Sequence, residues 1–275
     1  MLTIGLPCSI NKFSLNVCRE CKPISDELYS LFYPYATYDE YVQSSMYDVV
    51  FDVEKDNISV VIGNDVIYSH SYSVLFDAYR KIVSIIRDNT ILKENYCLLH
   101  GATIAYDTSA YLLLAESQMG KSTLSMFMHM TNEFECIGDD VVIIDMRNFQ
   151  IYPISKYIHI RENAIDLIGT NMLATLTYNS LIDRYQYRLY DHRFNKEFIV
   201  KGIFILDRKE SANRVNRVGS PYTEIIHNSF LPFQLRNNVV NSVLLSNRID
   251  VWRSEYSTLV QAYQHIKQIC NEHIK

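Results

Sequence analysis

The feature that most constrains this fold is a short succession of three segments between residues 111 and 130. Residues 111–114 form an apolar run typical of a buried strand, the loop after it contains Gly120, and residues 121–130 have the character of a helix. Only 8 of the 275 residues are glycine, so the presence of one in this loop is informative. A strand that passes through a short loop into a helix is the building unit of α/β proteins, and we therefore expect that class.

The same alternation continues through the second part of the chain. Residues 97–105, 141–145 and 198–206 are apolar and strand-like, whereas residues 224–228 and 257–270 are expected to be helical. The first part differs. Residues 47–53, 57–62 and 66–69 are three short strand-like runs separated by turn residues, which predicts two consecutive hairpins, and 74–87 has helical spacing. We therefore expect a small α+β unit over residues 1–95, followed by an α/β domain over residues 96–275.

Composition excludes two classes of partner. Acidic residues number 31 and basic residues 26, which gives a net charge of −5. Nucleic-acid binding needs clustered lysine and arginine, so we expect no nucleic-acid partner. No apolar run reaches 18 residues, and the N-terminus lacks a basic start followed by an apolar stretch, so we expect neither a membrane span nor a secretory signal.

Cysteine usage fits a cytoplasmic protein. Six cysteines in 275 residues are too few for a disulfide scaffold. Cys18 and Cys21 form a CxxC pair, but a zinc site would need further ligands nearby, and the first 60 residues contain no histidine. We expect these to be free thiols, and Cys97, Cys136 and Cys270 to pack in the core as small apolar residues.

The loop around Gly120 has the chemistry of a phosphate site. Residues 115–122 match G-x-x-x-x-G-K-[ST], the phosphate-loop pattern, except that Ala115 replaces the first glycine. Backbone N–H groups at such a helix start point at phosphate oxygens, and the helix dipole favours negative charge there. Lys121 would reach the β- and γ-phosphates, and the Ser122 hydroxyl would ligate Mg²⁺. The alternative is a plain helix start with one basic residue; the strand before the loop and the helix after it favour nucleotide binding.

A pair of carboxylates follows the loop at short range. Asp139 and Asp140 come after Gly138, immediately before a buried strand. Adjacent carboxylates at such a position are costly unless they bind a cation or a proton. In phosphoryl transfer one carboxylate holds Mg²⁺ and another takes the proton of the attacking hydroxyl. A solvated turn is the alternative, since glycine and aspartate both favour turns.

Three motifs together resemble one family. Residues 99–102 (LHGA), 120–124 (GKSTL) and 138–141 (GDDV) resemble the C-terminal domain of HPr kinase/phosphorylase and, more broadly, the PEP-carboxykinase-like P-loop proteins. The short interval between the loop and the aspartate pair is the specific part. The resemblance covers residues 97–165 well and 198–272 only in pattern, and it implies a kinase domain with a mixed sheet. Residues 1–95 resemble the small N-terminal unit of shorter homologues, among them the serine kinases of lasso-peptide precursors.

The resemblance implies a nucleotide site. Carried over by position, Lys121 contacts the nucleotide phosphates, and Ser117, Gly120 and Thr123 belong to the same loop. Arg161 is a further candidate for a phosphate contact; taken alone, it would be a surface charge.

The resemblance also implies catalytic and metal-binding roles. Asp139 is the base for the acceptor hydroxyl, Ser122 and Asp140 bind Mg²⁺, and His100 lies close to the transferred phosphate or the metal. The sequence leaves open which aspartate does which. Two glycines of the family loop are replaced, by Ala115 and Gln118. The C-terminal motif of the phosphorylase activity is not found, which favours kinase chemistry over phosphorolysis.

The motifs and the resemblance together predict an ATP- and Mg²⁺-dependent kinase that phosphorylates a serine hydroxyl of a peptide or small protein. The resemblance also implies a lasso-peptide precursor as one acceptor, and it leads us to expect a homo-oligomer. The alternatives are a small-molecule kinase acting on free serine or a sugar, and a nucleotide-binding regulatory module without catalysis. No motif identifies the acceptor. Residues 185–190 alternate and are either an edge strand that meets a peptide or core packing.

Overall fold

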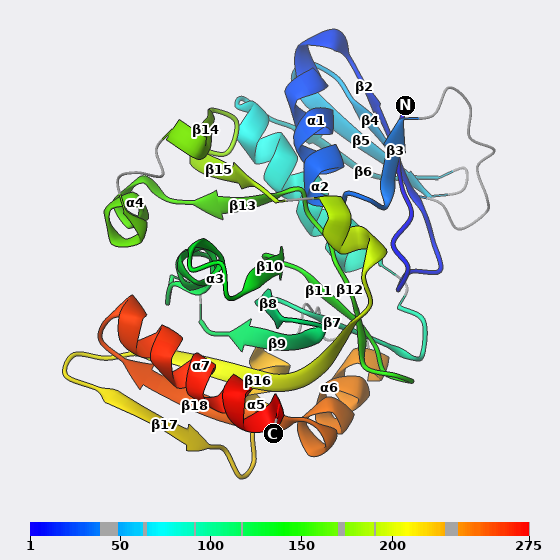
Figure 1. The fold of residues 1–275 in the computed structure, drawn as a ribbon. Helices are drawn as coiled ribbons and strands as arrows, with labels where there is room; N and C mark the ends of the chain where they lie inside the picture. Colours follow the sequence, from blue (N-terminus) through cyan, green and yellow to red (C-terminus); the bar gives the residue numbers. More distant parts are fainter. Residues whose placement is uncertain are drawn as a thin grey trace.

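The strand, loop and helix around Gly120 form as the sequence predicts. In the computed structural model, which describes residues 1–38, 49–62, 65–90, 92–116, 118–169, 174–189, 191–228 and 236–274, β9 (Ser109–Leu114) leads into α3 (Lys121–Met130) (Figure 1). Both elements belong to the second part of the chain, whose large sheet carries the cavity described below.

The large sheet is organised by its longest strand, β16 (Phe198–Arg208). This strand pairs in parallel with β9 on one side and with β18 (Asp250–Tyr256) on the other, and its first residues pair antiparallel with β12. The strand order is β10-β8-β9-β16-β12-β11-β7, with β18 and β17 continuing from β16. Parallel and antiparallel pairs therefore occur in one sheet, and the α/β class with a mixed sheet is confirmed. The remaining strands are β7 (Tyr96–Leu99), β8 (Ala102–Tyr106), β10 (Glu135–Gly138), β11 (Val142–Asp145), β12 (Gln150–Tyr152) and β17 (Asn213–Arg217).

Helices cover both faces of this sheet because its central strands are apolar on both. Leu113 and its neighbour Phe204 pack with α3 and α7 (Leu259–Ile274), whereas Leu112 and Leu114 pack in a second cluster with α5 (Tyr222–His227) and α6 (Arg236–Arg248). Successive strand residues point to opposite faces, so one uninterrupted apolar run serves both layers. The predicted helices at 224–228 and 257–270 are confirmed as α5 and α7.

The predicted single strand over residues 97–105 is wrong. The segment divides into β7 and β8, which lie at different places in the sheet, and His100 and Gly101 lie between them. A Cβ on Gly101 would lie only 3.0 Å from the carbonyl oxygen of Leu113. Between β7 and β8 the chain therefore passes so close to β9 that there is room only for a glycine at this position.

A three-stranded sheet lies above the phosphate loop. Its order is β13 (Tyr157–Ile160), β15 (Arg184–Arg188) and β14 (Leu176–Asn179), and α4 (Glu162–Ile168) follows β13. The idea that residues 185–190 form a peptide-binding edge is wrong for the described residues, because β15 is the central strand and pairs on both sides. One face packs Ile158 and Ile160 against Met126 of α3.

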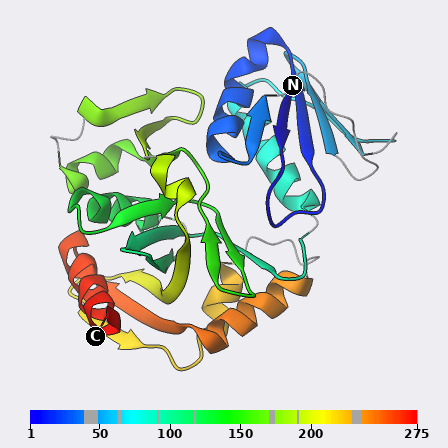
Figure 2. The same ribbon diagram turned by 45° about the vertical axis from the view of Figure 1, so that its right-hand side comes forward.

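The N-terminal part is a second sheet with two helices. Its strand order is β3-β1-β2-β4-β5-β6, and the antiparallel succession β4-β5-β6 confirms the two predicted hairpins. Figure 2 shows this part beside the larger one. Val141, Ile143 and Ile154 share its hydrophobic core, so the division at residue 95 stays a prediction. The elements of this part are β1 (Leu2–Ile4), β2 (Phe13–Val17), α1 (Lys22–Leu31), β3 (Ala36–Tyr38), β4 (Val49–Val53), β5 (Asn57–Ile62), β6 (Asp65–Ser71) and α2 (Leu75–Asn89), with a short 3-10 helix at Arg19–Cys21. A second short 3-10 helix, Asp191–Asn195, lies between β15 and β16 in the other part of the chain.

The cysteines are unpaired, as the sequence predicts. All six cysteines are free, and Cys97, Cys136 and Cys270 are buried among apolar side chains. Among the described residues there is no helix with both the length and the apolar character that crossing a bilayer requires.

Gly202 is a position where the large sheet tolerates no side chain. A Cβ there would lie 2.6 Å from Cζ3 of Trp252 and 2.9 Å from Cδ1 of Tyr111. We expect Gly202→Ala to lower the free energy of unfolding by about 1–3 kcal/mol through overpacking. Gly219→Ala is the matched control, because this glycine is exposed and a Cβ there meets nothing within 4 Å. Urea unfolding measures both variants, and equal stabilities would contradict the prediction.

Candidate active site

A cavity of about 360 Å³ opens where β9 passes into α3. It brings together most of the predicted site residues, from segments far apart in the sequence: His100, Gly120, Lys121, Ser122, Thr123, Asp140 and Arg161. Asp139 is buried beside it, and Ser117 lies outside the described residues. The cavity is also lined by residues that were not predicted to belong to the site, namely Gln118, Met119, His159, Asn163, Ala164, Leu167, Arg184, Arg208, Tyr256 and Leu259.

The loop is held closed by its own lysine. Lys121 Nζ donates a hydrogen bond to the carbonyl oxygen of Ala115 at 2.7 Å and approaches that of Glu116 at 3.4 Å. The Tyr256 hydroxyl donates to the carbonyl oxygen of Met119 at 3.0 Å. Burial lowers the pKa of Lys121, and the nearby Asp140 and Asp139 oppose that shift. Because Lys121 lines the cavity, its ammonium group can contact an anion that binds there.

The start of α3 offers backbone donors to that anion. Gly120, with φ +93, precedes the helix, and no side chain of a described residue caps it. The first N–H groups of a helix have no partner within the helix, and they carry the positive end of its dipole. Ala115 is not among the described residues with positive φ, so its Cβ is tolerated there, whereas Gln118 has φ +72.

Asp139 fits a cation. Its side chain is 2% exposed, and Oδ1 accepts a hydrogen bond from the Ser122 hydroxyl at 3.0 Å. Its Oδ2 is buried and has no hydrogen-bond partner among the described residues. Burial, followed by the charge of Asp140, raises the pKa of Asp139 to about 7. An orphaned carboxylate oxygen beside a serine hydroxyl is a donor set that suits Mg²⁺.

Asp140 is placed differently. Its side chain is 44% exposed and lines the cavity, and its backbone has φ +64. Partial burial would raise the pKa of this carboxyl, but the ion pair with His159, together with the charges of His100 and Lys121, holds it below the usual value. Its carbonyl oxygen lies 2.9 Å from His100 Nδ1, and since a carbonyl only accepts, that nitrogen carries the proton. Burial, together with Lys121, lowers the pKa of His100, which favours the neutral ring.

Three arginines give the cavity its positive charge. Arg161 directly precedes α4, Arg184 begins β15 and Arg208 ends β16. The sequence predicted only Arg161. Arg208 follows the buried run at 198–206, and ligand sites in α/β sheets lie beyond the carboxyl ends of strands, so that rule would have found it. Arg184 has no such signal.

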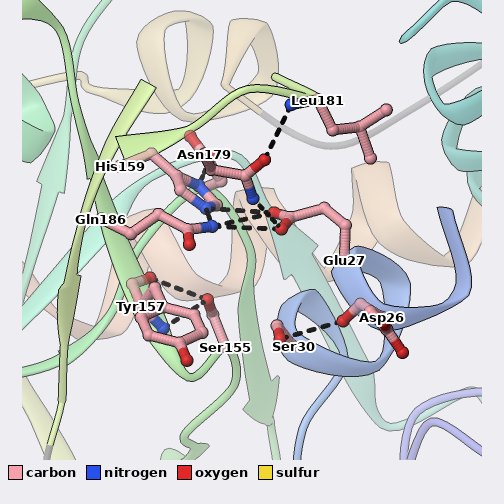
Figure 3. A network of polar contacts seen from close by, with 10 residues as sticks. Asp26, Glu27, Ser30, Ser155, Tyr157, His159, Asn179, Leu181 and Gln186 are labelled. Carbon is pink, nitrogen blue, oxygen red and sulfur yellow. Dashed lines mark hydrogen bonds and ion pairs between the residues drawn. The ribbon is translucent and has the colours of Figure 1, made fainter. Parts of the chain in front are cut away.

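His159 joins the cavity to the N-terminal part. Its Nδ1 lies 3.9 Å from Oδ2 of Asp140, and its Nε2 lies 3.2 Å from Oε1 of Glu27 in α1 (Figure 3). Burial alone would lower the pKa of His159, but its ion pairs with Asp140 and Glu27 raise it to about 10. His159 was missed, although it lies two residues before Arg161, whose backbone is still extended just after β13, so that both side chains lie on the same face.

This raised pKa predicts a specific pH dependence of stability. A folded-state pKa above the ordinary value of 6.5 contributes stability that is complete below that pH and is lost as the pH rises through about 10. We expect His159→Gln to remove this component, so that the difference in unfolding free energy between wild type and variant shrinks as the pH rises over this interval. Urea unfolding at several pH values measures it. His227→Gln, at an exposed histidine, is the control; a pH-independent difference for His159→Gln would refute the prediction.

Comparisons with known proteins give similar solved structures but no matching family model. No curated protein sequence matches the chain significantly. Among solved structures, the HPr(Ser) kinase/phosphatase from Coxiella burnetii aligns with a TM-score of 0.34 and 12% identity, over 65% of this chain and 99% of that one. An overlap this low carries no argument about activity, so the function proposed below is based on the cavity itself.

Proposed function

We propose that the protein is an ATP-dependent kinase that transfers the γ-phosphate of ATP to a serine hydroxyl of a peptide or small protein, with Mg²⁺ as its cofactor. The observation that carries this proposal is that the start of α3, one lysine and three arginines meet at one cavity that Asp140 lines, while Asp139 is buried beside it. Phosphoryl transfer needs mainly positioning and charge neutralisation, and this cavity offers both.

Phosphate binding is assigned to the loop and the arginines. The amides at the start of α3 and the Lys121 ammonium bind the β- and γ-phosphates. Arg161, Arg184 and Arg208 face the same space and neutralise the oxygens of the transferring group. The residues that suit Mg²⁺ are Ser122 and Asp139, and the ion would supply further neutralisation of phosphate charge.

The geometry favours an exchange of the two predicted aspartate roles. Asp139 is buried against Ser122, which suits a metal ligand, and Asp140 faces the cavity, which suits a base. In the proposed step Asp140 takes the proton of the serine hydroxyl while the hydroxyl oxygen bonds to the γ-phosphorus. The bond from that phosphorus to the bridging oxygen breaks, and ADP leaves with the bonding pair.

The acceptor is assigned to an adjoining cavity of about 490 Å³. It shares Arg161, Asn163 and Arg184 with the first cavity and is open to solvent beside Tyr178 and Tyr185. This open cavity fits an extended segment of an acceptor peptide whose serine points toward Asp140. A lasso-peptide precursor is the narrower proposal, drawn from the sequence resemblance. We further propose that the protein acts in the cytoplasm and has no nucleic-acid or membrane partner. We also propose that it forms a homo-oligomer.

Nucleotide binding should depend on Lys121. We expect saturating MgATP, at about a hundred times its dissociation constant, to stabilise the wild type by about 2.7 kcal/mol. Lys121→Ala should lose this stabilisation and all transfer, because the ammonium is the cation nearest the loop. Lys201→Ala, at an exposed lysine of β16, should behave as wild type. Thermal unfolding with and without MgATP measures the effect, and an equal shift in Lys121→Ala would exclude the loop as the site.

Transfer itself tests the function. Wild type is incubated with γ-labelled ATP and a library of serine-containing peptides, with free serine as competitor, and the products are identified by mass spectrometry. Phosphoserine in a peptide supports the proposal. Phosphorylation of free serine alone would replace it by the small-molecule kinase, and binding of MgATP without any transfer would replace it by the regulatory module.

The two aspartates should fail in different ways. Asp140→Asn is expected to lower kcat by about a hundredfold or more through loss of the base, while the nucleotide complex keeps its affinity for Mn²⁺. Asp139→Asn keeps the acceptor for Ser122 but loses the charge, and should weaken Mn²⁺ binding at least about tenfold. Electron paramagnetic resonance measures bound Mn²⁺. The opposite pattern would restore the roles first expected from the sequence.

A further inference from the structure

Glu27 is a buried carboxylate outside the cavity, in helix α1 of the N-terminal part. Its side chain is 4% exposed. The Asn179 side-chain amide donates to Oε2 at 2.6 Å, and the Gln186 amide donates to the same oxygen at 3.1 Å. A buried charge is costly unless it is paired and hydrogen-bonded, so this site is built around the carboxylate.

The positive partner of Glu27 is His159. The antiparallel register places His159 directly opposite Gln186, and both side chains lie on the sheet face that meets α1, as Figure 3 shows. His159 Nε2 lies 3.2 Å from Glu27 Oε1, and the Gln186 amide lies 3.1 Å from that nitrogen. A protonated Nε2 and the Gln186 NH2 group are both donors, so they do not bond to each other; the Glu27 carboxylate accepts from both and fixes the ring from behind.

The other side of the ring faces the cavity. His159 Nδ1 lies 3.9 Å from Asp140 Oδ2, whereas the backbone of Asp140 is held separately, by His100 at its carbonyl oxygen. The direction of the Asp140 carboxylate thus depends on where His159 lies, and the position of His159 depends on Glu27. This is the arrangement in which an outer carboxylate orients a histidine that in turn acts on a reactive group.

Attachment of α1 does not require this chain of contacts. The backbone N–H of Lys156 donates to Ser30 at 2.8 Å, and that of Ser155 donates to Tyr33 at 3.1 Å. The Lys156 ammonium also lies over the Tyr29 and Tyr33 rings. The charge on Glu27 therefore has a use beyond fastening the two parts together.

We propose that Glu27 is a positioning residue of the active site, which holds His159 and, through it, the carboxylate of Asp140 in the direction that phosphoryl transfer needs. The N-terminal part of the chain thereby completes the catalytic centre. The inference rests on the proposed kinase function only for its catalytic consequence, since the geometric dependence of Asp140 on Glu27 can be measured without turnover.

The kinetic test compares Glu27→Gln with Asp26→Asn, Glu27→Asp and His159→Gln. Glu27→Gln preserves size and removes the charge; we expect kcat to fall about tenfold while the KM for ATP stays within about twofold, because only the acceptor side is displaced. Asp26→Asn is the control on the same helix, since Asp26 pairs with Lys22 at the surface, and it should match wild type. Glu27→Asp keeps the negative charge but moves the carboxylate away from His159, because aspartate is one methylene shorter, and it should give an intermediate kcat.

A double variant distinguishes positioning from a general loss of structure. If Glu27 acts through His159, Glu27→Gln/His159→Gln should be no slower than His159→Gln alone. Multiplicative losses in the double variant, or an unchanged kcat in Glu27→Gln, would overturn the proposal. If Glu27→Gln does not fold, the kcat of Glu27→Asp tests the proposal instead. A kcat equal to that of the wild type would overturn the proposal.

A spectroscopic arm separates failure of this inference from failure of the kinase proposal. Carboxyl ¹³C resonances of aspartate are recorded without nucleotide, with Asp140→Asn for assignment. We expect the Asp140 signal to shift in Glu27→Gln but not in Asp26→Asn, and the shift to vanish in a His159→Gln background. Such a shift in a protein that transfers no phosphate would reject the kinase and keep the coupling, whereas an unmoved Asp140 signal would reject the coupling whatever the activity.

Discussion

The repulsion between Asp139 and Asp140 is the constraint around which the site is arranged. Two neighbouring carboxylates at the end of a buried strand cannot both stay charged in the same surroundings. The chain separates them by backbone conformation: Asp140 has φ +64 and turns outward to the cavity, while Asp139 stays inside against Ser122. Different surroundings then move the two pKa values in opposite directions, with that of Asp139 raised and that of Asp140 lowered. One residue type thus differs in protonation at two adjacent positions.

Each carboxylate draws its compensation from a different part of the fold. Asp139 receives the Ser122 hydroxyl from the first turn of α3, so the phosphate loop and the acidic turn are tied directly. Asp140 faces His159 of the three-stranded sheet, which is itself compensated by Glu27 of α1. Buried polar groups of this kind are stable only when every member is satisfied. The small sheet and the N-terminal helix are therefore required by the charge of the site and not only by packing.

The sequence predicted what local patterns can specify. The run from β9 into α3 was found because strand, glycine and helix follow each other directly, and the aspartate pair was found because its members are adjacent. Glu27 and His159 are separated by 132 residues, and nothing in either segment indicates the other. The division of residues 97–105 was missed because both halves are apolar, and only the close approach of Gly101 to Leu113 shows where the chain turns. Whether β15 lies at an edge or inside its sheet was left open, because alternation specifies a strand but not its neighbours.

The loop before α3 keeps its conformation with fewer glycines than the phosphate-loop pattern contains. Ala115 needs no positive φ, so this replacement costs no backbone strain, whereas Gln118 with φ +72 carries a cost of about 1–2 kcal/mol. The hydrogen bonds from Lys121 to Ala115 and from Tyr256 to Met119 fasten the loop on either side of that residue and offset the strain. A phosphate that engages Lys121 competes with a neutral carbonyl for the ammonium. Because a charged acceptor binds an ammonium more strongly than a neutral one, the exchange favours the nucleotide. The contact that keeps the loop formed is thus also one that a phosphate can displace.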